Sequence, residues 1–313
     1  GTKIGATGDT AIFTGLNDTN TTNTFVTSVT GITFSTTAGA FILGGNQVTL
    51  GGNVVNNAAT TVQTINLALA LSGNQQLNSV GSSSMLQING VISGTGFGLE
   101  KTGLGTLNLS AANTYSGSTT VSAGILQVSG VAGALSNTGS VAINGGTLLL
   151  SGSASNRVNN AATVNLGNSA STSKLQISGA VTETLGALTL SNTGGGIRVI
   201  DFGAGGGSLT FASIASSVGT VALQIWNWTA SGGTADQLIA TTGFGANPAL
   251  TDITFYSDGG TTSLGTAKWV SGTTGTLVPV PEPGALFAGL ALMAPLAWRE
   301  RRHWLRCREA RVC

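Results

Sequence analysis

The strongest constraint on the fold is a short alternation of apolar and polar residues that recurs through most of the chain. Period-2 runs of about four to six residues are typical of β-strands that bury one face. Turn signals rich in Gly, Asn and Ser, such as 44–46, 93–96, 116–118 and 144–146, separate these runs. The runs lie at 32–34, 47–50, 64–69, 85–88, 106–109, 125–128, 140–143, 147–150, 163–166, 174–177 and 187–190.

Strands this short and this numerous need a local way to bury their apolar face. A sandwich of some twenty strands would be unusually large for one domain, whereas in a solenoid each coil packs only on its neighbours. The pattern therefore predicts an all-β solenoid, with roughly 20 residues per coil and on the order of a dozen coils. Strand length and turn spacing alone do not separate this fold from one or two β-sandwiches, which remain the alternative.

Composition narrows the class of protein further. Only 7% of the 313 residues are charged, whereas 41% are hydrophobic and 48 are Gly. Regularly spaced Val, Ile and Leu argue against disorder, and frequent Thr, Ser and Asn break up any long apolar span between residues 2 and 278. The outer surface is therefore expected to consist of hydroxyl and amide groups.

The distribution of charge and of metal-binding residues excludes several functions. Residues 1–278 contain eight acidic and six basic residues, a net charge of −2, and so offer no basic stripe for nucleic acid. Cys307, Cys313 and His303 lie in the C-terminal tail and are the only residues of their types. The rest of the chain therefore has no disulfide framework and no thiolate or imidazole metal site, and we expect no cofactor.

One stretch, 86–130, carries a family resemblance. It contains Leu-Glu-Lys-Thr-Gly-Leu-Gly-Thr-Leu-Asn-Leu-Ser at 99–110, Ala-Asn-Thr-Tyr-Ser-Gly at 112–117 and Thr-Thr-Val at 119–121. This stretch resembles the autotransporter-associated β-strand repeat, also called the passenger-associated transport repeat. The resemblance implies a right-handed parallel β-helix outside a Gram-negative cell. The end of the chain differs from the C-terminal β-barrel of an autotransporter, which argues against self-translocation.

A change in pattern divides the chain into three parts, with a solenoid at 1–194 and a β-rich cap at 195–278. Open solenoid ends need caps, and Trp226 and Trp228 are candidates to cover the last coil. The alternative is that both indoles share one outward strand face and form a sugar-stacking platform. The third part, 279–313, is the C-terminal tail.

The tail resembles a PEP-CTERM sorting signal. Pro281, Glu282 and Pro283 precede an apolar segment at 284–298, and a basic tail, 299–313, follows it. The apolar segment is expected to form one short membrane helix, and the positive residues are expected to stay cytoplasmic, which places the body outside. The basic residues nearest the membrane are Arg299, Arg301, Arg302 and Arg306.

The tail resemblance implies processing by exosortase, a transient anchor in the inner membrane and association with exopolysaccharide. Since Gly1 begins within mature-looking sequence, we expect an N-terminal leader to be missing. The predicted function is that of an exported structural or adhesin-like protein of the cell surface or matrix, interacting with exopolysaccharide or with like chains.

An enzymatic role is not expected. A polysaccharide-degrading β-helix enzyme would need clustered carboxylates for acid/base work or for Ca²⁺, and the eight acidic residues of the body are scattered. Asp252 and Asp258 flank a strand and a turn, where Asp is a common turn former. Asp201 is expected to form a surface pair with Arg198 or an Asx-turn. The glycine-rich 203–207 lacks the context of a phosphate loop.

Overall fold

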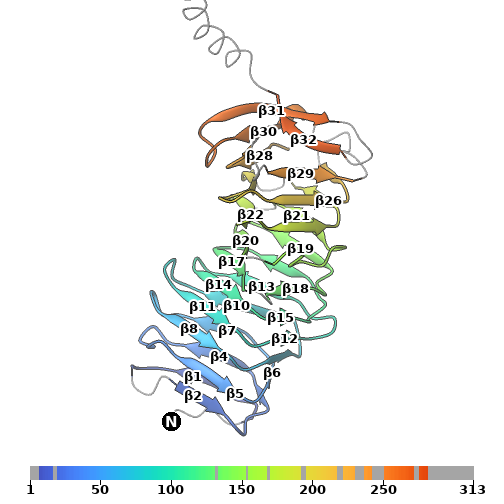
Figure 1. Cartoon of the computed structure of the whole chain (residues 1–313). Helices are drawn as coiled ribbons and strands as arrows, with labels where there is room; N and C mark the ends of the chain where they lie inside the picture. The colour runs from blue at the N-terminus through green and yellow to red at the C-terminus, as the bar shows by residue number, and fades with distance from the viewer. Residues whose placement is uncertain are drawn as a thin grey trace, which may run out of the picture.

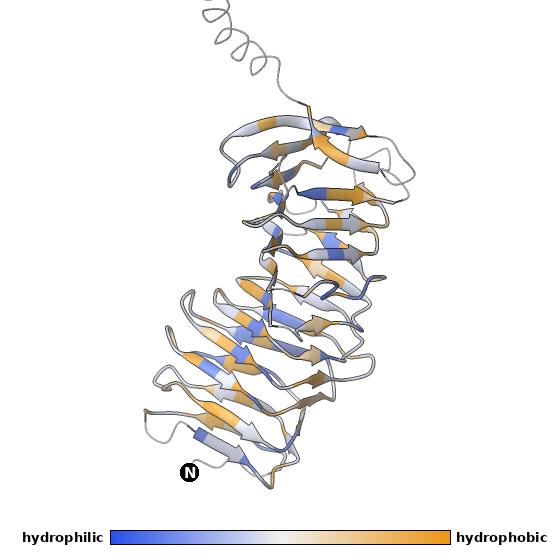
Figure 2. Cartoon of the chain, in the orientation of Figure 1, coloured by the Kyte–Doolittle hydropathy of each residue, from blue (hydrophilic) through white to orange (hydrophobic). Residues whose placement is uncertain are grey.

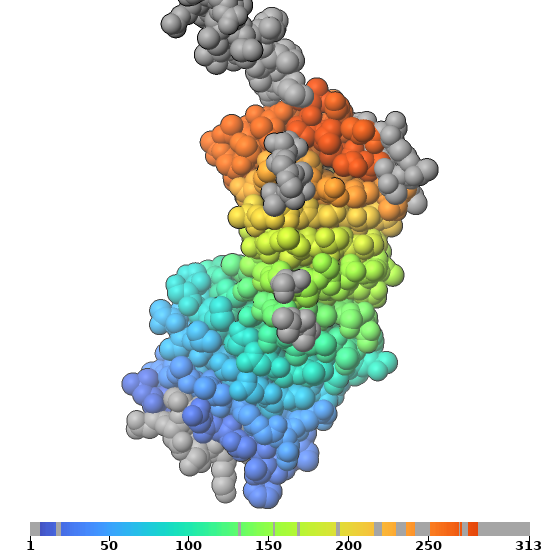
Figure 3. All heavy atoms as spheres, in the orientation of Figure 1, coloured from blue at the N-terminus to red at the C-terminus, as the bar shows by residue number. Residues whose placement is uncertain are grey.

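The computed structural model shows an elongated β-solenoid (Figure 1). It describes residues 7–16, 20–130, 133–152, 154–167, 170–191, 195–216, 221–229, 236–241, 250–270 and 275–280. In the space-filling view, consecutive segments of the chain form successive bands along the long axis of the body (Figure 3). The prediction of an all-β solenoid is therefore confirmed, and the sandwich alternative is wrong.

Two sides of the solenoid are continuous parallel sheets. The first side has ten strands: β1 (Thr10–Phe13), β4 (Gly31–Phe34), β7 (Val54–Asn56), β10 (Gln75–Ser79), β13 (Leu99–Thr102), β16 (Thr119–Val121), β19 (Ser140–Ile143), β21 (Thr163–Leu166), β24 (Leu188–Leu190) and β27 (Ile214–Ser216). The second side contains β2 (Asn20–Asn23), β5 (Ile42–Gly45), β8 (Val62–Ile65), β11 (Met85–Ile88), β14 (Thr106–Leu109), β17 (Ile125–Val128), β20 (Thr147–Ser151), β22 (Ser173–Ser178), β25 (Arg198–Asp201), β28 (Leu223–Trp226) and β30 (Ile253–Tyr256).

The third side is made of separate groups of short strands. The first group contains β3 (Ser28–Val29), β6 (Val48–Leu50), β9 (Leu69–Leu71) and β12 (Ile92–Ser93). The second pairs β15 (Ala112–Asn113) with β18 (Ala134–Leu135), and the third contains β23 (Thr182–Leu185), β26 (Ser208–Phe211) and β29 (Gln237–Ala240). This side is therefore interrupted where the other two continue.

The coils are longer and fewer than the sequence suggested. Partners on adjacent strands of the first side lie 20 residues apart at Leu99 and Thr119, but 26 apart at Leu188 and Ile214. The ten strands of this side make about nine coil-to-coil steps. The expected dozen coils is wrong because the turns between strands add residues to most coils.

The core is a continuous column of inward-facing apolar side chains. Hydrophobic and hydrophilic residues alternate along the strands (Figure 2), and Leu107 and Val121, both predicted to point inward, are buried. Inward residues of successive coils stack on one another because parallel pairing keeps them in register, as in the pairs Leu86–Leu107 and Leu107–Leu126.

A hairpin closes the C-terminal end of the solenoid. β31 (Ser263–Val270) pairs antiparallel with β30, and β32 (Gly275–Pro279) pairs antiparallel with both β31 and β29. The hairpin thereby joins the edges of the second and third sides across the last coil (Figure 1). A short 3₁₀ helix, η1 (Leu250–Asp252), precedes β30. The last edges of the second and third sides are paired in this way, as the predicted β-rich cap requires.

Candidate functional site

The two tryptophans singled out by the sequence lie in different environments. Trp228 is only 5% exposed and packs edge-on against Phe202 and Phe255, with ring centroids 5.3 and 4.8 Å away. Trp226 is half-buried on the outer face. The alternative in which both indoles share one outward face is wrong, because β28 ends at Trp226 and the positive φ of 56° at Asn227 breaks the alternation. Trp228 instead covers the core of the last coils.

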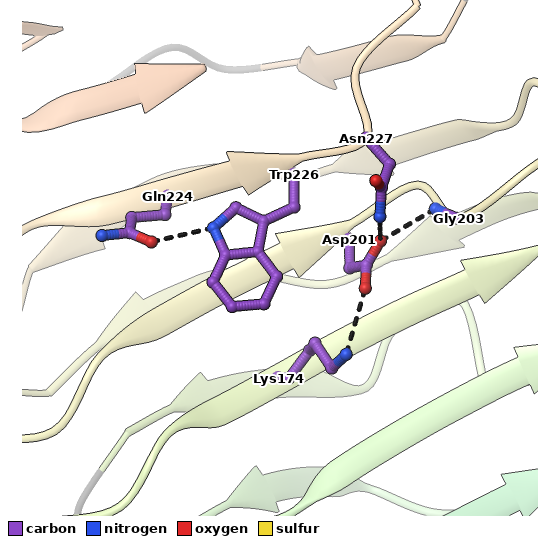
Figure 4. Close-up of polar contacts among 6 residues, drawn as sticks. All are labelled: Lys174, Asp201, Gly203, Gln224, Trp226 and Asn227. Carbon is purple, nitrogen blue, oxygen red and sulfur yellow. Dashed lines mark hydrogen bonds and ion pairs between the residues drawn. The ribbon is translucent and has the colours of Figure 1, made fainter. Parts of the chain in front are cut away.

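Trp226 belongs to a polar network on the outer face of the second side (Figure 4). Its Nε1 donates to Gln224 Oε1 at 2.8 Å, and Lys174 Nζ lies 5.6 Å from the centre of its ring. Lys174 Nζ also forms an ion pair with Asp201 Oδ2 at 3.1 Å. An ammonium so placed is attracted to the face of the indole, so Lys174 links three successive coils.

Asp201 is the centre of this network and is almost fully buried. Its Oδ1 accepts hydrogen bonds from Gly203 N at 2.9 Å and from Asn227 Nδ2 at 2.6 Å (Figure 4). The bond from Gly203 N is the Asx-turn expected from the sequence, whereas the ion pair is with Lys174 rather than with Arg198. Because both of its oxygens are bonded to neighbouring groups, this carboxylate links adjacent coils and has a structural role.

A buried lysine, Lys101, lies within the stretch 86–130 that carries the family resemblance. Lys101 is 1% exposed, and its Nζ donates to the carbonyl oxygens of Thr102, Gly103 and Ala123 at 2.6 to 3.3 Å. Burial lowers the pKa of Lys101 to about 8. The ammonium thus satisfies backbone carbonyls of two adjacent coils at a corner of the solenoid, which the sequence analysis did not foresee.

A second buried charged cluster lies where the third side is interrupted. Glu183 is fully buried, and its carboxylate accepts the backbone N–H groups of Arg157 at 2.8 Å and Val158 at 3.4 Å. The Arg157 guanidinium donates to the carbonyl oxygens of Gly133 and Gly130 at 2.9 and 2.8 Å. Burial raises the pKa of Glu183 to about 7, although these hydrogen bonds and the nearby Arg157 oppose the shift.

The alternation of apolar and polar residues in each strand places both Lys101 and Glu183 on the inward face. Leu99 and Lys101 are two residues apart, as are Glu183 and Leu185, so each charged residue occupies an inward position. The alternation alone does not identify them as buried, because Lys and Glu are almost never fully buried unless they are paired. The strand pattern does not supply the remote partners, such as Ala123 for Lys101 and Arg157 for Glu183, which lie 22 and 26 residues away in the chain.

The other acidic residues of interest have local structural roles. Asp258 accepts hydrogen bonds from the N–H groups of Thr261 and Thr262, which lowers the pKa of its carboxyl and confirms the expected turn. Asp236 accepts from Gly207 and Thr229, while burial raises its pKa. Within the described ranges, no three His, Cys, Asp or Glu side chains gather where a metal ion could bind.

The predicted sorting segment lies outside the described residues. This applies to Pro281, Glu282 and Pro283, to the apolar segment 284–298, to Arg299, Arg301, Arg302 and Arg306, and to Cys307, Cys313 and His303. Among the residues that the structure does describe, none forms a helix that is long and apolar enough to span a membrane.

Comparison with known proteins identifies one segment. Residues 99–128 match the family model of the passenger-associated transport repeat. Searches among curated proteins and among solved structures gave no significant match. The matched segment begins at β13, runs through β14 to β17 and contains Lys101. The repeat and the solenoid together fit a surface-exposed repeat protein.

Proposed function

We propose that this chain is an exported structural or adhesin-like protein of the bacterial cell surface or extracellular matrix, without enzymatic activity. The observation that carries the proposal is the passenger-type repeat at 99–128, which runs through two successive coils of the solenoid. A solenoid gives length and stiffness because every coil is hydrogen-bonded to the next. Such a body presents a long surface away from the point at which it is attached.

The chemistry of the outer face supports this role. Outward residues on adjacent coils form amide and hydroxyl ladders, in which Asn108 Nδ2 donates to Gln87 Oε1 at 2.8 Å and Ser129 Oγ donates to Asn108 Oδ1 at 2.7 Å. These ladders consolidate the surface without charge, so salt affects them little. A surface of this kind suits contact with hydroxyl-rich matrix material or with like chains.

Sorting is the second element of the proposal. Pro281-Glu282-Pro283, the apolar segment 284–298 and the basic tail follow directly after the strand β32. In this proposal the tail holds the chain in the inner membrane of a Gram-negative cell until exosortase cleaves near 281–283. The cap hairpin ends at Pro279, so cleavage near 281–283 would leave the solenoid and its cap intact.

Mass spectrometry of the protein isolated from its native cells tests the proposal. We expect a mature chain that ends near 281–283 and is recovered from the cell surface or matrix. Glu282→Ala should leave the chain uncleaved in the membrane fraction, while the matched control Asp258→Ala, in a turn of the cap, should be processed normally. An intact wild-type chain through Cys313 would refute sorting by exosortase, and recovery from the cytoplasm would refute export.

A further inference from the structure

A groove of about 300 Å³ lies on the outer face of the first side. Its lining includes Gln76, Glu100 and Thr120, which are outward residues of β10, β13 and β16 and are partners in register on three successive coils. Asn74 and Ser118, in the turns before β10 and β16, are exposed and also line it. We call this feature the amide groove. Its volume is at the lower end of the range for small-ligand sites.

The polar groups of the amide groove are held in fixed positions. Gln76 Nε2 donates to Glu100 Oε2 at 3.0 Å, and Ser122 Oγ donates to Glu100 Oε1 at 2.6 Å. Each carboxylate oxygen therefore has one fixed partner and keeps accepting capacity toward the groove. Within the described part of the chain, Gln76 Oε1 and the hydroxyl of Thr120 have no hydrogen-bond partner. The groove thus offers preorganised acceptors and a hydroxyl.

This chemistry selects for a ligand rich in hydroxyl groups. Sugar hydroxyls both donate and accept, so they can satisfy carboxylate, amide and hydroxyl groups in one array. The single carboxylate in the groove disfavours a polyanion. Because the three outward residues are on successive coils, about 4.8 Å apart, an extended polymer along the solenoid axis would meet each of them in turn.

We propose that the amide groove binds a neutral glycan chain, with Glu100, Gln76 and Thr120 as its hydrogen-bonding residues. The site is distinct from the network around Trp226, which lies on the second side. The proposal does not depend on sorting by exosortase, because it rests only on the geometry of the solenoid. Its failure would leave the expected mature C-terminus unchanged, so the two proposals can be distinguished.

Affinity electrophoresis of the full chain in gels containing dextran, laminarin, hydroxyethyl cellulose or alginate tests this proposal. We expect at least one of the three neutral polymers to retard the wild type, and alginate to have no effect. Glu100→Ala should weaken binding about tenfold, since hydrogen bonds to a charged group are the stronger ones. Gln76→Ala should weaken it less. Asn165→Ala, in the same outward column but outside the groove, is the matched control.

Three outcomes would overturn the proposal. They are the absence of retardation by every neutral polymer, equal retardation of Glu100→Ala and the wild type, and loss of retardation in Trp226→Ala but not in the groove variants. The last result would move the site to the network around Trp226. Circular dichroism and melting curves identify variants that fail to fold. Glu100→Gln, which keeps one acceptor and the shape of the side chain, should weaken binding less than Glu100→Ala does.

Discussion

Replacing the buried Glu183 with Gln should remove a pH dependence from the stability of the solenoid. Burial raises the pKa of Glu183 from its ordinary 4.5 to about 7, so the folded protein binds this proton more tightly than the unfolded chain does. The contribution of protonated Glu183 to the free energy of unfolding is therefore fully present below pH 4.5 and is lost as the pH rises through about 7. At 1.36 kcal/mol for each pKa unit, the loss amounts to about 3 kcal/mol.

Urea unfolding at about pH 5 and at about pH 8 measures this effect. We expect the fall in unfolding free energy between the two pH values to be smaller in Glu183→Gln than in the wild type by up to about 3 kcal/mol. The comparison cancels contributions shared by both proteins, such as that of Asp236. Glu100→Gln, which changes a carboxylate on the outer face, is the control. An identical pH dependence in the wild type and in Glu183→Gln would refute the reasoning.

Three further predictions follow from the packing of the coils. Leu107→Ala should destabilise the fold by about 2–5 kcal/mol in urea unfolding, and unchanged stability would contradict the register. Gly103→Ala should lower the melting temperature more than Gly96→Ala does. Both glycines have positive φ, but only at Gly103 would an added Cβ collide with the neighbouring coil, at the carbonyl oxygen of Ser79. Equal melting temperatures of the two variants would contradict this. Because the pKa of Lys101 is lowered to about 8, the free energy of unfolding of the wild type should rise with pH from about 8 toward 10.5. Urea unfolding of Lys101→Met over the same pH range should not show this rise.

The all-β class and the inward faces could be predicted because they depend on local alternation. Leu107 and Val121 point inward as their strands require, and the Asx-turn at Asp201 and the turn at Asp258 follow from the preferences of Asp. These features involve residues only a few positions apart. The β-rich cap was expected on a different ground, since an open solenoid end exposes unpaired strand edges, but the hairpin that forms it was not foreseen.

The contacts between coils could not be predicted because their partners are remote in the chain. The ion pair of Lys174 with Asp201 spans 27 residues, and the amide groove needs the register of three strands at once. A change of one residue in the length of a turn would reverse which side chains face outward. Trp228 illustrates this point, because a single residue in the left-handed conformation, Asn227, turns its indole into the core.

The cap hairpin has a mechanical consequence. β32 lies between β31 and β29, so the last described strand is hydrogen-bonded along both of its edges. A pull applied through residue 280 therefore loads two ladders together, and these lead into the second and third sides of the solenoid. An edge strand would instead peel from a single neighbour. If the body is attached at this end, both ladders must therefore break before a pulling force can detach the last described strand from the solenoid.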